Sequence, residues 1–311
     1  MSNLNEIAKK IMSGGKGILA ADESNGTADK RLEAVGSKTG EEMRRQYRDL
    51  FLSTPNIERY VSGVILYQET LGQRSDNGKM FCEHLESIGI LPGIKVDTGA
   101  KDSENFEGEK ITEGLDGLED RLQNCCNCGT KFTKWRMVVS IDENHDLPTK
   151  GAVLENSIRL AKYAKKVQEA GMVPIIEPEV LLEGPHSMET AEQVIRETLH
   201  VVFDQIKEEG VDVGGLILKT SMVVPGNASG EEMIPGEVAK KTIGVLKEVV
   251  PEGIGGVVFL SGGQTSEEAR DNLNEMAKME PFPFEIAFSY ARAIQQPALK
   301  IWKGKKENVE D

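Results

Sequence analysis

The feature that most constrains the fold of this chain is a regular alternation of short apolar runs with longer amphipathic segments. Each run ends in polar or glycine residues, which is typical of a strand buried on both faces. The chain contains eight such runs: Gly17–Ala21, Val61–Tyr67, Gly93–Val96, Trp135–Ile141, Met172–Ile176, Leu216–Leu218, Gly256–Leu260 and Phe284–Phe288. The pattern predicts a sheet of buried, parallel strands.

The segments around these runs carry apolar residues at helical spacing. The predicted helices are Asn3–Met12, Gly40–Leu52, Lys79–Ile88, Leu115–Cys125, Gly151–Ala170, Glu189–Glu209, Gly236–Val249, Thr265–Met279 and Tyr290–Trp302. The sequence Thr265-Ser266-Glu267-Glu268 fits a capping box, so a helix is expected to start just after the seventh run.

A length of 311 residues favours two domains, unless the fold is a barrel. Here strands and helices alternate without a break in composition. We therefore predict an α/β fold, a (β/α)8 TIM barrel that forms a single domain over residues 1–311, with 303–311 as a short charged C-terminal stub. The alternative is a doubly wound sheet, but no glycine fingerprint opens the first strand–helix turn.

The charge balance of the chain argues against some classes of partner. It has 37 basic and 51 acidic residues, a net charge of -14, which disfavours binding to nucleic acid or to an anionic membrane. No apolar run reaches the roughly 18 residues of a membrane helix. The N-terminal segment is amphipathic and lacks a signal-peptide core, so we expect a cytoplasmic protein.

The four cysteines, Cys82, Cys125, Cys126 and Cys128, include a CCNC cluster. A metal site there would need a second Cys-x-x-Cys pair, which the sequence lacks. We expect reduced thiols and no metal ion or other cofactor.

A lysine ends the apolar stretch Gly214–Met222. Strand alternation places Lys219 on the same face as Gly215 and Ile217. A lone lysine at a strand end is more often simply solvated. A desolvated lysine, however, lowers its pKa readily, and a neutral amine can form a Schiff base with a ketone or aldehyde.

Further polar residues follow or flank the predicted strands. Active sites of (β/α)8 barrels lie at the C-terminal ends of the strands, so these side chains are expected to converge there. The candidates are Asp22, Lys95, Lys134, Arg136, Glu177, Glu179 and Lys219. Glu69 also follows a strand, and we interpret it as structural.

Two groups of residues suit phosphate binding on opposite rims of the predicted barrel. The loops after strands seven and eight offer backbone N–H groups, hydroxyls and a guanidinium: Ser261, Gly262, Gly263, Ser289, Ala291 and Arg292. The opposite rim offers Ser24, Thr27, Arg31 and Lys95. Two such sites with a lysine between them suit a bisphosphorylated keto-sugar.

At these positions the chain resembles class I fructose-bisphosphate aldolase, over about Asn5 to Asn308. The matching motifs are GKGILAADES, GVILYQETLGQ, GIKVD, EGLDGL, KWR, VPIIEPEVL, LILKTSMVVPG, FLSGGQ and FSYARA. The resemblance implies a (β/α)8 barrel, typically a homotetramer, that acts in glycolysis and gluconeogenesis. It also implies metal-independent cleavage of fructose 1,6-bisphosphate to dihydroxyacetone phosphate and glyceraldehyde 3-phosphate.

The resemblance also implies a role for each matching residue. Lys219 matches the Schiff-base lysine, and Glu177 matches the acid/base that removes water from the carbinolamine. Glu179 matches the glutamate that neighbours this acid/base and lies beside the lysine. Lys134 matches a residue that assists Schiff-base formation. Asp22 matches the acceptor of the C4-hydroxyl proton. The C1-phosphate would contact Ser261, Gly262 and Arg292, and the C6-phosphate Ser24, Thr27 and Lys95, with Arg136 and Arg31 nearby.

The sequence departs from the family pattern at three places. Thr220-Ser221 stands where the family often has Pro-Asn, and Ala291 where many members have glycine, which requires a negative φ at this alanine. The family commonly continues into a tail that ends in a tyrosine, which helps to protonate the enamine. Lys303–Asp311 holds no Tyr, His or Cys, which predicts slow release of dihydroxyacetone phosphate.

Two other functions fit parts of the pattern. A transaldolase or deoxyribose-phosphate aldolase would also use a barrel lysine, but two phosphate rims and the sequence Glu177-Pro178-Glu179 disfavour it. A sugar-phosphate-binding or scaffold protein without turnover is disfavoured because Lys219, Glu177, Asp22 and Lys134 are all present.

Overall fold

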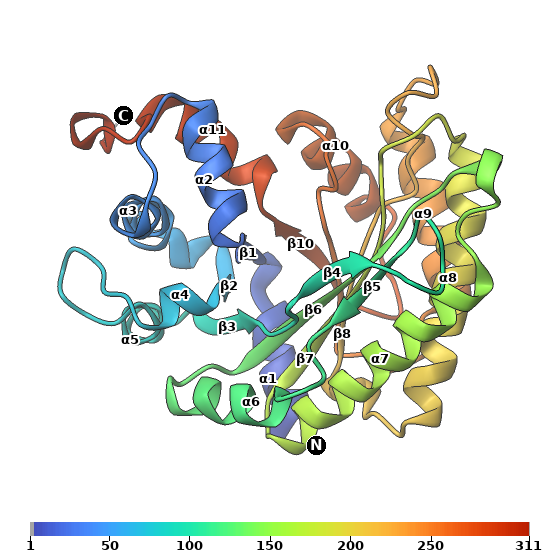
Figure 1. Cartoon of the computed structure of the whole chain (residues 1–311), viewed down its shortest axis with the longest axis horizontal. Helices are drawn as coiled ribbons and strands as arrows, with labels where there is room; N and C mark the ends of the chain where they lie inside the picture. Colours follow the sequence, from blue (N-terminus) through green and yellow to red (C-terminus); the bar gives the residue numbers. More distant parts are fainter. Residues whose placement is uncertain (1–2, 311) are drawn as a thin grey trace.

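A closed barrel of parallel strands forms the centre of the molecule, as the sequence predicted (Figure 1). The computed structural model describes residues 3–310. Within this range eight strands close in the order β1-β2-β3-β6-β7-β8-β9-β10. They are β1 (Gly17–Ala21), β2 (Val61–Leu66), β3 (Leu91–Lys95), β6 (Phe132–Val139), β7 (Val173–Val180), β8 (Ile217–Thr220), β9 (Gly256–Phe259) and β10 (Ile286–Tyr290).

Helices surround the outer side of this barrel (Figure 1), and the N-terminal helix packs against the residues of its interior. They are α1 (Asn3–Met12), α2 (Asn25–Ala34), α3 (Glu41–Leu52), α4 (Gln68–Leu71), α5 (Phe81–Ser87), α6 (Leu118–Asn127), α7 (Lys150–Glu169), α8 (Met188–Glu208), α9 (Pro235–Val249), α10 (Ser266–Ala277) and α11 (Arg292–Trp302). Short 3-10 helices lie at Ser13–Gly15, Ile57–Arg59, Glu143–His145, Val213–Gly215 and Lys306–Asn308. The last of these belongs to the predicted stub 303–311, whose final residue, like residues 1 and 2, lies outside the described range.

The predicted capping box at the start of α10 is confirmed. The Thr265 hydroxyl accepts a hydrogen bond from the Glu268 N–H at 3.1 Å, and the Glu268 carboxylate accepts one from the Thr265 N–H at 2.8 Å. These bonds satisfy two N–H groups that the first turn of a helix leaves free.

The apolar core has two parts. Inside the barrel, inward-facing residues such as Ile65, Phe132 and Ile175 pack with Ile11 and Met12 of α1. A larger cluster fills the space between the barrel and the outer helices. The narrow interior requires small residues at some positions, because a Cβ at Gly93 would overlap the Phe132 ring. This packing leaves the opposite end of the barrel open for the polar residues.

The predicted bounds of two strands were wrong. The sequence placed Lys134 before a strand at Trp135–Ile141, and Glu177 after a strand at Met172–Ile176. Both residues lie inside longer strands, β6 and β7, which pair over their whole length in the register Lys134↔Ile175 and Arg136↔Glu177. Burial against the neighbouring strand outweighs the polar character of these side chains, which apolar periodicity alone does not capture.

Helix α2 and a β-hairpin were not predicted. Asn25, Gly26 and Thr27 are poor helix formers, but Ser24 caps α2, and Ala28 and Leu32 bury its inner face. The hairpin pairs β4 (Gly99–Asp102) with β5 (Lys110–Glu113), two short strands rich in charge. Tertiary contacts decide both elements, and both lie beside the open end of the barrel.

Two further features concern partners and ligands. Across residues 3–310, every helix is too short or too polar to cross a membrane. Cys82 and Cys125 are buried, whereas Cys126 is half-buried and Cys128 is exposed. Over the same range, no group of three or more His, Cys, Asp or Glu side chains is placed to hold a metal ion.

Candidate active site

A cavity of about 600 Å³ opens at the C-terminal end of the barrel. Every residue predicted for the site lines it except Gly263: Asp22, Ser24, Thr27, Arg31, Lys95, Lys134, Arg136, Glu177, Glu179, Lys219, Ser261, Gly262, Ser289, Ala291 and Arg292. Gly263 lies beside it, since a Cβ there would be 3.7 Å from Nη2 of Arg292. The candidate residues therefore converge at the C-terminal end of the barrel, as expected from the predicted fold.

An ion-paired chain of four side chains crosses the floor of this cavity. Lys219 Nζ lies 2.9 Å from Glu177 Oε1, and Glu177 Oε2 lies 3.0 Å from Lys134 Nζ. Lys134 Nζ continues the chain to Asp22 Oδ2 at 2.7 Å. All four residues are at most 9% exposed, so these charges compensate one another away from bulk water. Glu177 is the shared partner of both lysines.

Burial and charge act in opposite directions on these groups. Burial alone would raise the pKa of Asp22, but the ammonium groups of Lys134 and Lys219 lower it to about 2. Burial likewise raises the pKa of Glu177, and the same two lysines bring it below its ordinary value. Burial would lower the pKa of Lys134, but Asp22 and Glu177 hold it well above the usual range. Asp22 is thus a carboxylate and Lys134 an ammonium at neutral pH.

Glu179 and Arg136 form a second ion pair on the adjacent strands β7 and β6. Two-residue spacing places Glu179 on the same face as Glu177, and Arg136 on the same face as Lys134. The resemblance placed Glu179 beside the lysine. In the structure Glu179 forms its ion pair with Arg136, whose side chain is 39% exposed. This pair therefore lines the cavity above the buried chain.

The rim formed by the β9 and β10 loops suits an anion. Gly262 and Gly263 have φ of 47° and 97°, positive values that favour glycine, and successive backbone N–H groups in such a turn can bind an anion. Helix α11 begins at Arg292, directly after Ala291, whose φ of -108° is negative as expected. The hydroxyl of buried Ser289 has no hydrogen-bond partner among the described groups.

The opposite rim is built on β1, α2 and β3. Ser24 caps α2, and its hydroxyl accepts from the Thr27 N–H at 3.4 Å. Lys95 pairs with Asp97, whose carboxylate also accepts from the Arg136 N–H at 3.2 Å. Arg31 pairs with Glu23. The cations of this rim are held in place by carboxylates from the same side of the cavity.

Sequence reasoning missed Glu23, Lys30 and Gly99, which also line the cavity. Glu23 is buried between Arg31 and Arg48, with Arg48 Nη1 2.7 Å from Glu23 Oε2. An acidic residue directly between Asp22 and Ser24 was the signal that could have identified it. Lys30 and Gly99 gave no such signal, because each enters the wall through an element that was not predicted.

Glu69, interpreted from the sequence as structural, forms an ion pair with Arg44 at 2.6 Å. The same arginine pairs with Asp29 at 2.9 Å. These contacts tie α2, α3 and α4 together, which agrees with a structural role.

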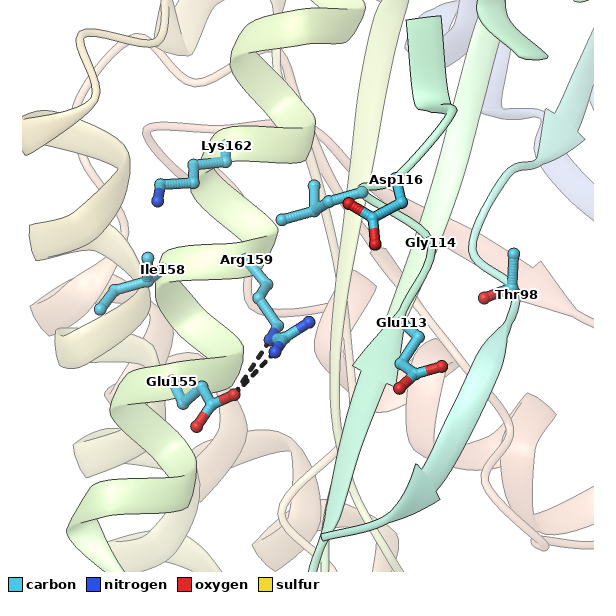
Figure 2. A pocket seen from close by; sticks show the side chains of 9 residues that line it. Thr98, Glu113, Gly114, Asp116, Glu155, Ile158, Arg159 and Lys162 are labelled. Atoms are coloured by element: carbon cyan, nitrogen blue, oxygen red, sulfur yellow. Dashed lines mark hydrogen bonds and ion pairs between the residues drawn. The ribbon is translucent and has the colours of Figure 1, made fainter. Parts of the chain in front are cut away.

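A second hollow, of about 580 Å³, lies outside the barrel between α7 and the segment around β5 (Figure 2). Arg159 and Glu155 form an ion pair on its helical wall at 2.8 Å, with Glu113 and Thr98 across the opening. None of the predicted site residues lines this hollow. The cavity at the barrel mouth is therefore the candidate active site.

Asp22 is expected to make the stability of the protein depend on pH in acid. Folding lowers its pKa from 3.8 to about 2, so its stabilisation is present above about pH 4 and is lost as the pH falls toward 2. The difference corresponds to about 2 kcal/mol. Urea unfolding between pH 5 and pH 2 should therefore show a shallower pH dependence for Asp22→Asn than for the wild type.

The matched control for this measurement is Asp204→Asn on α8, where the side chain is exposed. Its free energy of unfolding should follow the pH dependence of the wild type. Equal pH dependence in Asp22→Asn and the wild type would contradict the electrostatic description of the buried chain.

The fold and the site together define a class of protein, the (β/α)8 barrels with a buried, ion-paired lysine at the C-terminal end of the strands. Comparison with known proteins narrows this class. Residues 3–311 match the family described as Fructose-bisphosphate aldolase class-I, and the chain belongs to this family.

Relatives from distant organisms match over nearly the whole chain. A probable fructose-bisphosphate aldolase class 1 of Xanthomonas axonopodis pv. citri (strain 306) is 45% identical over 302 residues, 97% of this chain and 90% of the relative. The cytosolic fructose-bisphosphate aldolase 4 of Arabidopsis thaliana is 43% identical over 304 residues, 97% of this chain and 77% of the relative.

A solved structure shares the fold. The fructose-bisphosphate aldolase of Plasmodium falciparum, in a ternary complex with TRAP and a small molecule inhibitor, superposes with a TM-score of 0.97 at 41% identity. The match covers 99% of this chain and 89% of the Plasmodium chain.

Proposed function

We propose that this protein cleaves fructose 1,6-bisphosphate reversibly to dihydroxyacetone phosphate and glyceraldehyde 3-phosphate, through a Schiff base on Lys219, in glycolysis and gluconeogenesis. The observation that carries the proposal is the buried chain Lys219–Glu177–Lys134–Asp22 on the floor of a cavity with an anion-binding rim on each side. Family membership over residues 3–311 supports it.

The reaction begins with formation of an imine. Glu177 takes a proton from the Lys219 ammonium, the neutral amine adds to the C2 ketone of the substrate, and loss of water from the carbinolamine leaves a protonated imine. Glu177, 2.9 Å from the lysine nitrogen, is placed to transfer the protons of this step. Lys134, between Glu177 and Asp22, holds both carboxylates in position and assists imine formation.

Cleavage of the C3–C4 bond then uses the imine as an electron sink. Asp22 accepts the C4-hydroxyl proton, the C4 oxygen becomes the aldehyde of glyceraldehyde 3-phosphate, and the bonding electrons move into the imine to give an enamine. Protonation of the enamine at C3 and hydrolysis release dihydroxyacetone phosphate and regenerate the lysine. Because the protonated imine accepts the electrons, the mechanism needs neither a metal ion nor another cofactor.

The two rims would hold the two phosphates of the substrate. We assign the C1-phosphate to Ser261, Gly262 and Arg292, with Gly263, Ser289 and Ala291 completing this rim. We assign the C6-phosphate to Ser24, Thr27 and Lys95, with Arg31 and Arg136 nearby. In this proposal the substrate would span the cavity with its C2 ketone above Lys219.

The relatives support a proposal for the cellular location and the assembly of the enzyme. We propose a cytoplasmic homotetramer, in keeping with the resemblance to the family and with the cytosolic relative from Arabidopsis thaliana. The negative net charge of -14 agrees with a small-molecule substrate rather than a nucleic-acid partner.

A coupled cleavage assay with and without EDTA tests the proposed function. We expect turnover of fructose 1,6-bisphosphate that EDTA does not reduce. Activity confined to monophosphorylated or unphosphorylated sugars would favour a transaldolase or deoxyribose-phosphate aldolase. Binding of the bisphosphate without turnover would favour a sugar-phosphate-binding protein.

Replacement of Arg292 with alanine should weaken phosphate binding selectively. A charge-assisted hydrogen bond is worth about 1.5–3 kcal/mol, so we expect KM for fructose 1,6-bisphosphate to rise about ten- to a hundredfold. The thermal midpoint should stay unchanged because Arg292 is exposed. Arg270→Ala, an exposed arginine of α10, is the control. An unchanged KM in Arg292→Ala would show that this rim does not hold phosphate.

A further inference from the structure

Ser221, two residues after Lys219, bridges β7 and β8 beyond the point where their pairing ends. Within the described chain, the register of these strands comprises Ile175↔Ile217 and Ile176↔Leu218. Above this point β7 continues to Val180 and carries Glu177 and Glu179. Glu177 and Lys219 therefore lie just beyond the last backbone pairing between their strands.

The backbone of β7 explains why the pairing ends there. The N–H groups of Val173 and Leu181 donate toward β6, to the carbonyls of Lys131 at 3.1 Å and Val139 at 2.9 Å. Successive N–H groups of a parallel strand point to opposite neighbours, so those of the even-numbered residues face β8. Pro178 is one of these and has no N–H to donate. The next even-numbered residue is Val180.

The side chain of Ser221 takes over the pairing at Val180. Its Oγ accepts a hydrogen bond from the Val180 N–H at 3.0 Å and donates one to the Val180 carbonyl at 2.9 Å. A hydroxyl is both donor and acceptor, so this one group does what a residue of a neighbouring strand would do. Ser221 and Val180 are 6% and 8% exposed, which leaves little room for water as a substitute.

We propose that Ser221 is a positioning residue, which ties β7 to β8 and thereby sets the distance between the Glu177 carboxylate and the Lys219 amine. The role in catalysis rests on the proposed function. Val180 is three residues from Glu177, and Ser221 is two from Lys219, so a shift at the tie moves both reacting groups. Proton transfer needs the 2.9 Å contact between them, and a misplacement of about 1 Å costs about a hundredfold in rate.

The neighbouring residue offers a matched control. Thr220 also carries a hydroxyl and is 1% exposed, but its hydroxyl has no hydrogen-bond partner among the described groups. Thr220→Val removes this hydroxyl and keeps the shape of the side chain. Ser221→Ala removes the hydroxyl of Ser221 and leaves the N–H and C=O of Val180 unpaired.

The first test compares kcat and KM for fructose 1,6-bisphosphate, well below the thermal midpoint of each variant. We expect kcat of Ser221→Ala to fall about ten- to a hundredfold. KM should change little, because the substitution leaves both phosphate rims untouched, one on β1, α2 and β3 and the other on the β9 and β10 loops. Thr220→Val should keep the kcat of the wild type, and Ser221→Thr, which retains the hydroxyl, should recover most of the loss.

The second test needs no turnover. Hydrogen exchange at the Val180 amide should be faster in Ser221→Ala than in Thr220→Val. Should Ser221→Ala fail to fold, Ser221→Cys replaces it, because a thiol of similar shape is a weak donor and acceptor, and the same changes in kcat and exchange are expected.

Several outcomes would overturn the role of Ser221. These are unchanged kcat in Ser221→Ala or Ser221→Cys, an equal loss of kcat in Thr220→Val, or unchanged exchange at Val180. A wild-type protein without cleavage activity would overturn the proposed function itself, and with it the catalytic role of the tie. Cleavage by the wild type with unchanged kcat in the variants would overturn the positioning role of Ser221 and leave the proposed function standing.

Discussion

Lys219→Ala is expected to abolish cleavage of fructose 1,6-bisphosphate while the protein stays folded. Loss of a covalent nucleophile removes the electron sink, and comparable losses elsewhere reduce kcat by about 10⁶-fold. The measurement is kcat of the variant in the coupled assay, with circular dichroism to confirm the fold. Lys240→Ala, an exposed lysine of α9, should retain full activity.

Borohydride trapping locates the same lysine directly. Reduction of the imine formed with dihydroxyacetone phosphate converts it to a stable secondary amine, which adds mass to one peptide. We expect that peptide to contain Lys219, because Lys134, the other lysine beside Glu177, is held as an ammonium by both Asp22 and Glu177. An adduct on Lys95 or Lys134 would refute the assignment, and Lys219→Ala should show no adduct.

Glu177→Gln is expected to have the second largest effect. The amide keeps the size of the side chain but cannot transfer a proton, and positioned proton transfer is worth about 10²–10⁴-fold in rate. The change also removes the anion shared by Lys134 and Lys219, so the free energy of unfolding should fall as well. The measurements are kcat well below the thermal midpoint and urea unfolding.

The controls for this variant separate a local from a general charge effect. Glu237→Gln replaces an exposed carboxylate of α9 and should leave kcat unchanged. Turnover of Glu177→Gln within tenfold of the wild type would show that another group transfers the protons of imine formation. Because Glu179 pairs with Arg136, Glu179→Gln would then be the next variant to measure.

The barrel and the composition of its mouth could be predicted from sequence because both depend on local patterns. Short apolar runs between amphipathic segments indicate parallel strands covered by helices. In a closed parallel barrel all strands end on the same face. A residue at the end of an apolar run can therefore be assigned to the mouth of the barrel from the sequence. Asp22, Lys95 and Lys219 were assigned to the mouth in this way.

The ends of elements were less predictable. Lys134 and Glu177 lie inside β6 and β7 rather than beside them, because pairing along the full register of these two strands outweighs side-chain polarity. Helix α2 forms on a poor helical sequence because Ser24 caps it and Leu32 buries its inner face. Local helix and strand propensities include neither strand pairing nor helix capping nor burial against other elements.

The sequence by itself determined the fold, the family and most of the polar residues around the cavity, because strand and helix periodicity and the motifs are local. Only the tertiary structure decided which of these residues touch. It joined Glu177 to both lysines, paired Glu179 with Arg136, and placed Ser221 against Val180, 41 positions earlier in the chain. Such contacts depend on strand register and on closure of the barrel, which bring together residues that no sequence spacing relates.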